Sequence, residues 1–251
     1  MNRKKTLFGV TIVLSIVFLL SIIGILVFDG VIWFVYPEKL GYTVKGIDVS
    51  RYQGAIDWET ISLQEIRFAF IKATEGSSYN DPMFSYNIIS SRQYGIYASA
   101  YHFFSSKSSG KAQAENFIST IAEHELDMPP ILDFEISKKE IQDIERISHE
   151  TKSFLHEIEN CFGIKPIIYT TYESYNAFLA NDFNDYMFWF RDLFSEPKIM
   201  GKQEWLFWQY CNRGRLNGID KQQRYVDLNV FKGDFYEFDV FINESKNLQN
   251  Q

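Results

Sequence analysis

An uncharged and almost entirely apolar segment near the N-terminus limits what this chain can fold into more than any other feature. The 23 residues from Thr6 to Phe28 carry no charge. As a helix they extend about 35 Å, enough to cross the hydrocarbon core of a bilayer. A helix that is apolar on every side has no polar face to present to water. We therefore expect residues 6–28 to contact the membrane as a spanning helix.

Charges beside this segment predict its orientation. Arg3, Lys4 and Lys5 precede it, and basic residues favour the cytoplasmic side, so the chain after Phe28 is expected outside the cytoplasm. A cleaved signal peptide is the alternative. Its apolar region is normally shorter and ends in a small-x-small site, whereas this run continues into Asp29-Gly30-Val31-Ile32-Trp33. Residues 1–36 are therefore predicted to form a basic cytoplasmic stub and an uncleaved signal anchor.

The rest of the chain alternates between short apolar runs and stretches with helical periodicity. Eight strands are predicted, at 44–49, 67–73, 95–103, 130–136, 166–171, 186–191, 205–210 and 226–231. Helices are predicted between the early strands, at 82–93, 110–124, 139–160 and 173–180.

This order predicts an α/β fold: a TIM-like barrel with five βα units and three further strands, preceded by one N-terminal transmembrane helix. Only about 14 residues separate the last strands from one another, which favours loops or antiparallel returns over helical crossovers. The expected domains are a linker at 37–43, a barrel domain at 44–242 and a polar tail at 243–251.

The charge of the chain bears on its partners, and its cysteines bear on disulfide pairing. The first 36 residues carry +2 and the other 215 carry −9, so nucleic acid is not an expected partner. Cys161 and Cys211 are the only cysteines. They are predicted at opposite ends of the barrel, as two buried and unpaired thiols.

Acidic residues gather where the predicted strands end. Alternation along PILDFEI places Asp133 and Glu135 on one face of a strand. Asp48 ends the first strand and Asp227 lies in the last, and these two strands are neighbours in a closed barrel. Carboxylates are rarely buried without partners, and like charges held close raise a pKa toward the range of a general acid. The cluster therefore predicts a catalytic site.

The ordered motifs of the chain resemble glycoside hydrolase family 25, the lysozymes or N-acetylmuramidases. They begin with Gly46-Ile47-Asp48-Val49-Ser50, Gln53-Gly54 and Trp58, followed by Ile71-Lys72-Ala73-Thr74-Glu75-Gly76. They continue through Ala100-Tyr101-His102-Phe103-Phe104, Gln113-Ala114-Glu115-Asn116-Phe117, Asp133-Phe134-Glu135, Trp208-Gln209-Tyr210 and Val226-Asp227-Leu228-Asn229. The resemblance covers roughly residues 44–236.

This resemblance implies hydrolysis of the β-1,4 bond between N-acetylmuramic acid and N-acetylglucosamine in peptidoglycan, within a bacterial cell envelope. Carried over by motif, Glu135 is expected to be the general acid. Asp133 is expected to orient or stabilise a developing oxazolinium or oxocarbenium ion. Asp48 and Asp227 are expected to position substrate or water and to tune the pKa of Glu135. The stereochemical course stays open, and participation of the substrate N-acetyl group is favoured.

Aromatic and polar side chains at the strand ends are expected to form the sugar subsites. The predicted substrate-binding residues are Tyr52, Glu75, Tyr101, Tyr169, Trp189, Arg191, Trp208, Gln209 and Asn229. His102 is as consistent with a structural role as with one beside the acids. No metal-ligand spacing such as H-E-x-x-H or C-x-x-C is present, so neither a metal nor a cofactor is expected.

The chain also departs from the family pattern. Many members have Trp-Ile-Ala in the sixth strand, where this chain has Trp189-Phe190-Arg191, and many have a histidine where it has Arg51 and Tyr52. Arg191 is expected to pair with an acid of the site or to contact a substrate carboxylate. Two alternatives to a muramidase stay open: a catalytically inactive barrel that binds peptidoglycan or serves as a scaffold, and a hydrolase of another N-acetylhexosamine polymer such as chitin.

Overall fold

The structure is a computed structural model of the 251-residue chain. It describes residues 3–137, 143–199, 204–220, 223 and 225–249. The chain divides into two compact units, Met1–Phe34 and Val35–Gln251.

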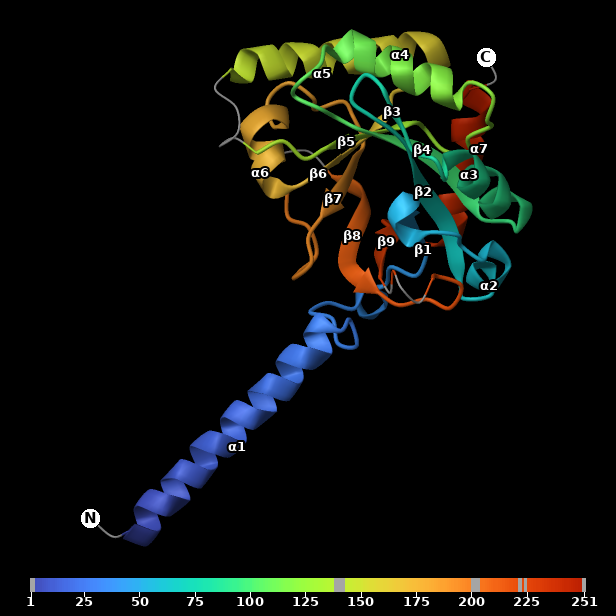
Figure 1. The fold of residues 1–251 in the computed structure, drawn as a ribbon. Coiled ribbons are helices and arrows are strands. Elements are labelled where there is room, and N and C mark those ends of the chain that lie inside the picture. Colours follow the sequence, from blue (N-terminus) through green and yellow to red (C-terminus); the bar gives the residue numbers. More distant parts are fainter. Residues whose placement is uncertain (1–2, 138–142, 200–203, 221–222, 224, 250–251) are drawn as a thin grey trace. The chain divides into compact units, whose positions relative to one another are not determined.

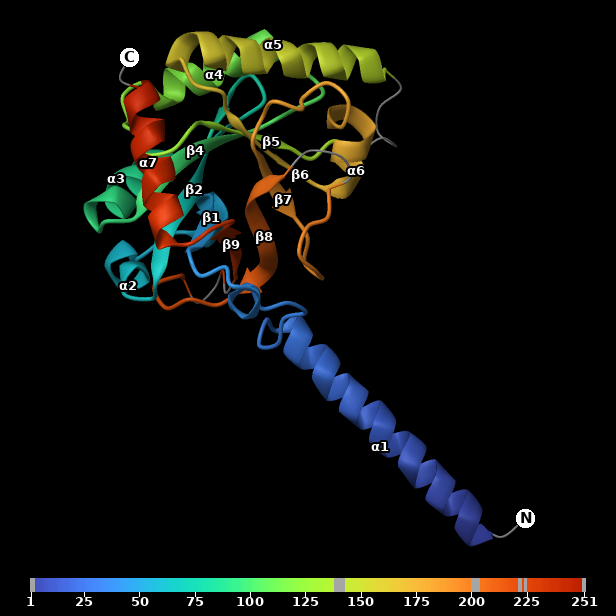
Figure 2. The ribbon, with the colours of Figure 1, turned by 180° about the vertical axis from the view of Figure 1, so that it is seen from behind.

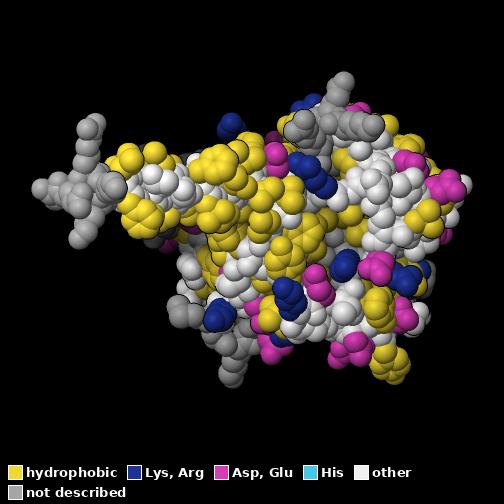
Figure 3. Space-filling model, turned by 90° about the horizontal axis from the view of Figure 1, so that it is seen from below, with side chains coloured by type: hydrophobic (Ala, Val, Ile, Leu, Met, Phe, Trp, Pro, Cys, Tyr) yellow, Lys and Arg dark blue, Asp and Glu magenta, His cyan; other side chains and the backbone are white. Residues whose placement is uncertain are grey.

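The first unit consists of one long helix, α1 (Arg3–Phe28), and the short segment that follows it. Within α1, Leu7–Phe28 has a mean hydropathy of 3.0, and this stretch is long and apolar enough to cross a membrane. Hydrophobic side chains cover the surface of the helix (Figure 3). The helix predicted over residues 6–28 is therefore present.

The second unit is a closed barrel (Figure 1). Its strands are β1 (Lys45–Val49), β2 (Ile66–Glu75), β3 (Tyr79–Asn80), β4 (Tyr97–Phe103), β5 (Ile131–Phe134), β6 (Ile167–Thr170), β7 (Phe188–Arg191), β8 (Trp205–Gly214) and β9 (Val226–Phe231). The sheet order is β1-β9-β8-β7-β6-β5-β4-β2-β3, and pairing of β1 with β2 closes it. Eight strands thus form the barrel, as predicted, and the two-residue β3 is an additional edge strand.

Among the eight barrel strands, strand direction changes only at the last one, whereas the short edge strand β3 also runs antiparallel to β2. The pairings from β1 through β2, β4, β5, β6 and β7 to β8 are parallel. The last strand, β9, is antiparallel to both β8 and β1. No helix is assigned among the described residues between β7 and β8, which agrees with the predicted change from helical crossovers to loops.

Helices cover the outside of the barrel. They are α2 (Trp58–Ser62), α3 (Phe84–Gln93), α4 (Gly110–Ile121), α5 (Ile144–Phe162), α6 (Tyr172–Ser174) and α7 (Phe235–Gln249), with 3-10 turns at Pro37–Leu40 and Arg51–Gln53 and a π-helical turn at Tyr175–Leu179. Helices α4 and α5 lie side by side (Figures 1 and 2). The helix predicted at 139–160 corresponds to α5, and its first residues, 139–142, lie outside the described residues.

Aromatic side chains fill the barrel interior. Phe68 and Phe70 of β2 pack against Phe207 of β8 at centroid distances of 5.0 Å each. A Cβ atom on Gly46 would lie 2.3 Å from the ring of Phe68, so the first strand needs glycine where it faces this ring.

Two predictions about the ends of the barrel were wrong. Residues 243–249, expected as a polar tail, belong to α7. Phe238 and Ile242 of that helix are buried in the same cluster as Phe68, so α7 covers the amino end of the barrel (Figure 2). Of the two cysteines, Cys211 is buried as expected, whereas Cys161 is exposed, and both are free thiols.

Candidate active site

The four acids predicted from the sequence line one cleft at the carboxyl end of the barrel. Its volume is about 230 Å³, and Asp48, Asp133, Glu135 and Asp227 all line it. Strand direction explains this arrangement. The parallel strand β1 ends near Asp48, while the reversed strand β9 begins near Asp227, and the two residues are register partners. Residues 179 positions apart in the sequence therefore face each other across one strand pair.

Two buried amides hold the carboxylate of Asp48. Asn229 Nδ2 donates to Asp48 Oδ2 at 2.8 Å, and Gln209 Nε2 donates to the same oxygen at 3.0 Å. Each amide is oriented in turn by a donor to its carbonyl oxygen, Trp189 Nε1 for Asn229 and the Tyr169 hydroxyl for Gln209, both at 2.8 Å. The amide NH2 groups are thereby directed at Asp48.

The carboxyl groups of Asp48 and Asp227 influence each other's ionisation. Burial raises the pKa of Asp48 to about 6, although the hydrogen bonds from Asn229 and Gln209 oppose that rise. Burial, followed by the charge of Asp48 and a hydrogen bond with it, raises the pKa of Asp227 well above its usual value. The amides favour the charged form of Asp48, and the charge of Asp48 raises the pKa of Asp227, so the pair favours a proton on Asp227 over one on Asp48.

Asp133 has an unsatisfied buried oxygen. The side chain is only 8% exposed, and its Oδ1 has no hydrogen-bond partner among the described residues. Burial raises the pKa of Asp133 well above the usual value, and the charges of Glu135 and Asp48 add to the rise. Buried polar atoms are normally hydrogen-bonded, so this oxygen is available to a group brought in by a ligand.

Glu135 follows β5 directly and forms an ion pair across the site. Arg191 Nη1, at the end of β7, lies 3.2 Å from Glu135 Oε2. Burial raises the pKa of Glu135, and the neighbouring guanidinium opposes that rise. The surroundings of the two acids in the Asp-x-Glu pair therefore differ: Glu135 has a cation as a direct partner, whereas Asp133 has none among the described residues.

Aromatic rings form the walls of the cleft. Tyr52, Tyr101, Tyr169 and Trp189 all line it. Tyr52 is 61% exposed at the rim, where the guanidinium of Arg51 lies 4.9 Å from its ring centroid. Trp189 packs against Tyr169 with centroids 4.3 Å apart. Together the rings and acids form a cleft suited to a polar ligand with apolar faces.

Five of the nine predicted substrate-binding residues are not among the described residues that line the cleft: Glu75, Arg191, Trp208, Gln209 and Asn229. Gln209 and Asn229 lie behind Asp48 and hold its carboxylate, and Arg191 pairs with Glu135. Trp208 is fully buried and donates from Nε1 to the carbonyl oxygen of Asp192 at 2.7 Å. Its neighbour Gln209 points to Asp48, and alternation along the strand sends Trp208 to the other face. Glu75 is also absent from the lining residues of the cleft among those described, and it pairs with Lys72 at 2.7 Å.

Lys72 lines the cleft and was missed in the sequence. Its Nζ lies 4.9 Å from the ring centroid of Phe103, another lining residue that was not predicted. The sequence could have predicted this position, because Phe68, Phe70 and Lys72 are two residues apart along β2 and so share one face of the strand. The two phenylalanines of that face point into the barrel interior.

His102 has a structural role. Thr74 Oγ1 lies 2.7 Å from Nδ1, and Gln113 Oε1 lies 3.1 Å from Nε2. Burial lowers the pKa of His102 to about 4, so the ring is neutral, accepts from Thr74 and donates to Gln113. Among the described residues, no group of His, Cys, Asp and Glu has the arrangement of a metal site.

Comparison with known proteins agrees with this geometry. Residues 47–219 match the family described as "Glycosyl hydrolases family 25". The uncharacterized protein YegX of Escherichia coli (strain K12) is 38% identical over 214 residues, which cover 82% of this chain and 75% of YegX. Lysozyme M1 of Streptomyces globisporus is 32% identical over 76% of this chain and 68% of its own length.

A solved structure also matches. A family 25 glycosyl hydrolase from Bacillus anthracis is 38% identical, with a TM-score of 0.74, over 80% of this chain and 94% of that one. The family match covers more than half of the chain, and it confirms the resemblance found in the motifs. The chain therefore belongs to glycosyl hydrolase family 25 and is a glycoside hydrolase.

Proposed function

We propose that the protein is a peptidoglycan hydrolase that cleaves the β-1,4 bond between N-acetylmuramic acid and N-acetylglucosamine. The observation that carries the proposal is the convergence of Asp48, Asp133, Glu135 and Asp227 on one cleft with aromatic walls. The similarity to Lysozyme M1 supports peptidoglycan as the substrate. Asp48 and Asp133 are buried, while Glu135 and Asp227 are partly buried. Burying neighbouring carboxylates costs free energy, and an inactive scaffold has no need of such a cluster.

Glu135 is the general acid of the proposed mechanism. It is more exposed than Asp133, with 27% of its side chain accessible, so it can reach the oxygen of the leaving sugar. Its pKa is raised by burial, which favours the protonated form that an acid needs near neutral pH. Breaking the glycosidic bond then transfers this proton to the leaving oxygen.

Asp133 serves as the partner of the substrate acetamido group. Its unsatisfied Oδ1 can accept the acetamido N–H, which orients the acetamido oxygen toward the anomeric carbon. The carbonyl oxygen forms the new bond as the glycosidic bond breaks, and water later opens the oxazolinium ion. Asp48, held by Asn229 and Gln209, forms with its neighbour Asp227 the floor that positions this water.

We also propose that α1 anchors the enzyme in the membrane, with the catalytic barrel outside the cytoplasm. The length and hydropathy of Leu7–Phe28 support the anchor, and Arg3, Lys4 and Lys5 support the orientation. If α1 is an uncleaved anchor, the full-length 29.5 kDa chain stays in the membrane pellet after alkaline extraction. A shorter, soluble chain would instead indicate a cleaved signal peptide.

Glu135→Gln tests the catalytic assignment. The variant keeps the shape of the side chain but cannot donate a carboxylic proton, so turnover of purified peptidoglycan should fall by at least about 100-fold. Asp133→Asn should also lose most activity. Lys165→Gln, which removes a surface partner of Asp185, is the control and should keep normal turnover. Near-normal turnover by Glu135→Gln would refute the assignment.

A further inference from the structure

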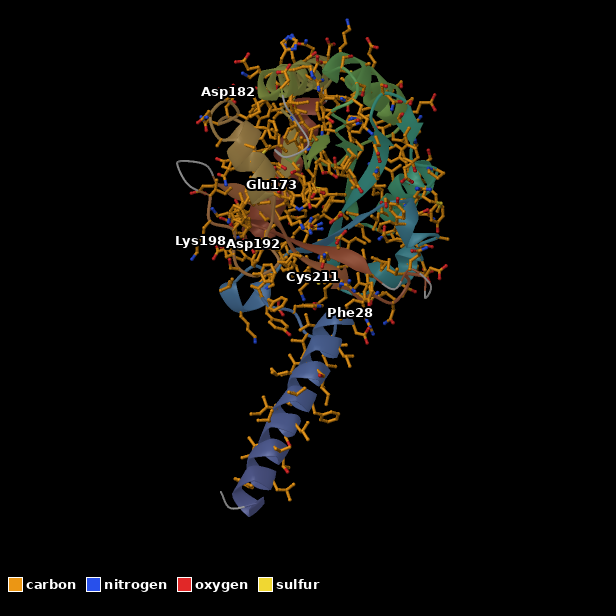
Figure 4. The ribbon with its side chains drawn as sticks, turned by 60° about the vertical axis from the view of Figure 1, so that its left-hand side comes forward. Phe28, Glu173, Asp182, Asp192, Lys198 and Cys211 are labelled. Carbon is orange, nitrogen blue, oxygen red and sulfur yellow. The ribbon has the colours of Figure 1, made fainter. Side chains whose placement is uncertain are left out.

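A second hollow adjoins the acidic cleft, and Glu135 lines both. Its volume is about 480 Å³. Arg191, Tyr172, Glu173, Asp192 and Phe194 are among its lining residues, and Glu173 and Asp192 lie on the same side of the barrel (Figure 4). A sugar chain lying over Glu135 would therefore place one of its substituents in this hollow.

Arg191 is the one Lys or Arg among the described residues that line the hollow. Its guanidinium pairs with Glu135 and interacts electrostatically with Tyr169. Tyr169 donates onward to Gln209, and Gln209 donates to Asp48. The arginine is thus fixed to the floor of the site on one side, while 35% of its side chain remains accessible.

The Arg191–Glu135 pair conflicts with the role of Glu135. A general acid must carry its proton, whereas an adjacent guanidinium favours the ionised carboxylate. A partly exposed ion pair contributes little to stability, so fold stability does not explain why this pair is present. A second anion that replaces Glu135 as the partner of Arg191 would remove the conflict.

We propose that Arg191 is a specificity-determining residue that binds a carboxylate carried by the substrate, and that its guanidinium exchanges Glu135 for this carboxylate on binding. A guanidinium presents a planar fork of donors that matches a carboxylate. This inference rests on the proposed function for the identity of the glycan. The carboxylate is either the lactyl group of N-acetylmuramic acid or an acidic group of its attached peptide.

The exchange couples recognition to catalysis. Once Arg191 turns to the substrate, its opposition to the rise in the pKa of Glu135 ends, and the acid takes up its proton. A neutral N-acetylglucosamine polymer carries no carboxylate, so it leaves the ion pair in place. The site would then select the acidic sugar over chitin through Arg191, a position at which many family members have alanine.

Binding to matched glycans tests the inference. The full-length chain in detergent carries Asp133→Asn to keep the ligands intact. The ligands are a muramic-acid tetrasaccharide with free lactyl carboxylates, the same glycan with these groups converted to methylamides, and the same glycan with its peptides attached. Each is titrated with Arg191 retained, with Arg191→Gln, with Arg191→Lys, and with Lys165→Gln as the control.

With Arg191 retained, a carboxylate-bearing glycan should bind about 10-fold more tightly than the methylamide glycan, as expected for one charge-assisted contact. Preference for the free lactyl form identifies that group as the source, and preference for the peptide form alone identifies the peptide. Arg191→Gln should abolish the preference, Arg191→Lys should restore part of it, and Lys165→Gln should leave it unchanged.

Several results would overturn the inference: equal binding of all three glycans, no binding of any, or a preference that survives Arg191→Gln. The proposed function fails separately. If the chain with unsubstituted Asp133 binds the acidic glycan preferentially but does not cleave it, the recognition role stands and the hydrolase assignment falls. If it cleaves all three glycans equally well, the hydrolase assignment stands and the recognition role of Arg191 falls.

Discussion

Replacing Asp48 with asparagine should make the folded barrel more stable while abolishing its activity. Burial raises the pKa of Asp48 from 3.8 to about 6, so keeping the group charged in the folded state costs free energy. At pH 8 this cost is about 3 kcal/mol, since each pKa unit corresponds to about 1.4 kcal/mol. The asparagine side chain in Asp48→Asn would carry no charge and would still offer one oxygen to the amides of Asn229 and Gln209.

The sign of the pH dependence follows from the direction of the shift. Because the folded state binds this proton more tightly than the unfolded state, the Asp48 group destabilises the fold as pH rises from about 4 to about 6, and its cost is constant above that range. The stability gained by Asp48→Asn should therefore shrink from about 3 kcal/mol at pH 8 to about 1 kcal/mol at pH 4.5.

Urea unfolding of the parent chain and of Asp48→Asn, in detergent at both pH values, measures this difference. Hydrolysis of peptidoglycan is assayed on the same samples. The reasoning is refuted if Asp48→Asn is no more stable than the parent at pH 8, or if the gain is equal at the two pH values. Either result would mean that the amides and Asp227 compensate fully for burial of the charge.

Three further substitutions test other parts of the account. Trp208→Phe removes the hydrogen bond to Asp192 and should lower the free energy of unfolding by about 1 kcal/mol. Its activity should stay within about 2-fold of the parent. A large loss of turnover in the folded variant would place Trp208 in the site after all. Gly110→Ala should destabilise the chain by more than about 3 kcal/mol, because the new Cβ would lie 1.8 Å from the carbonyl oxygen of Glu150. An unchanged urea midpoint would contradict that packing. The pKa of His102 is lowered to about 4. The stability linked to the neutral ring is therefore fully present above pH 6.5, and about 3 kcal/mol of it is lost as pH falls to about 4. His102→Gln should remove this pH dependence of stability, and an unchanged pH slope would refute the prediction.

Much of the site was predictable because its residues obey simple geometric rules. Alternation within one strand predicts that Asp133 and Glu135 share a face, and closure of the barrel predicts that Asp48 meets Asp227. Both predictions concern backbone geometry, which a repeated pattern of strands determines. The same rule identifies an error: adjacent strand residues face opposite sides, so Trp208 cannot lie on the side of the strand from which Gln209 contacts Asp48.

Other features depend on contacts that the sequence pattern does not contain. Helix α7 carries buried Phe238 and Ile242, while the exposed Asn243, Glu244 and Asn247 contribute to the polar composition that resembles a tail. The partner of Arg191 was also open from the sequence, since an acid of the site and a substrate carboxylate were both plausible. Only the folded barrel places its guanidinium 3.2 Å from Glu135.

The most direct test of the central claim is the chemical identity of the ends that the enzyme creates. Purified peptidoglycan is digested with the full-length chain and with Glu135→Gln, and the released fragments are reduced and analysed by mass spectrometry. We predict fragments that end in reduced N-acetylmuramic acid, produced by the parent chain and absent with Glu135→Gln. Fragments that end in reduced N-acetylglucosamine, or equal release by both proteins, would contradict the assignment of bond and acid.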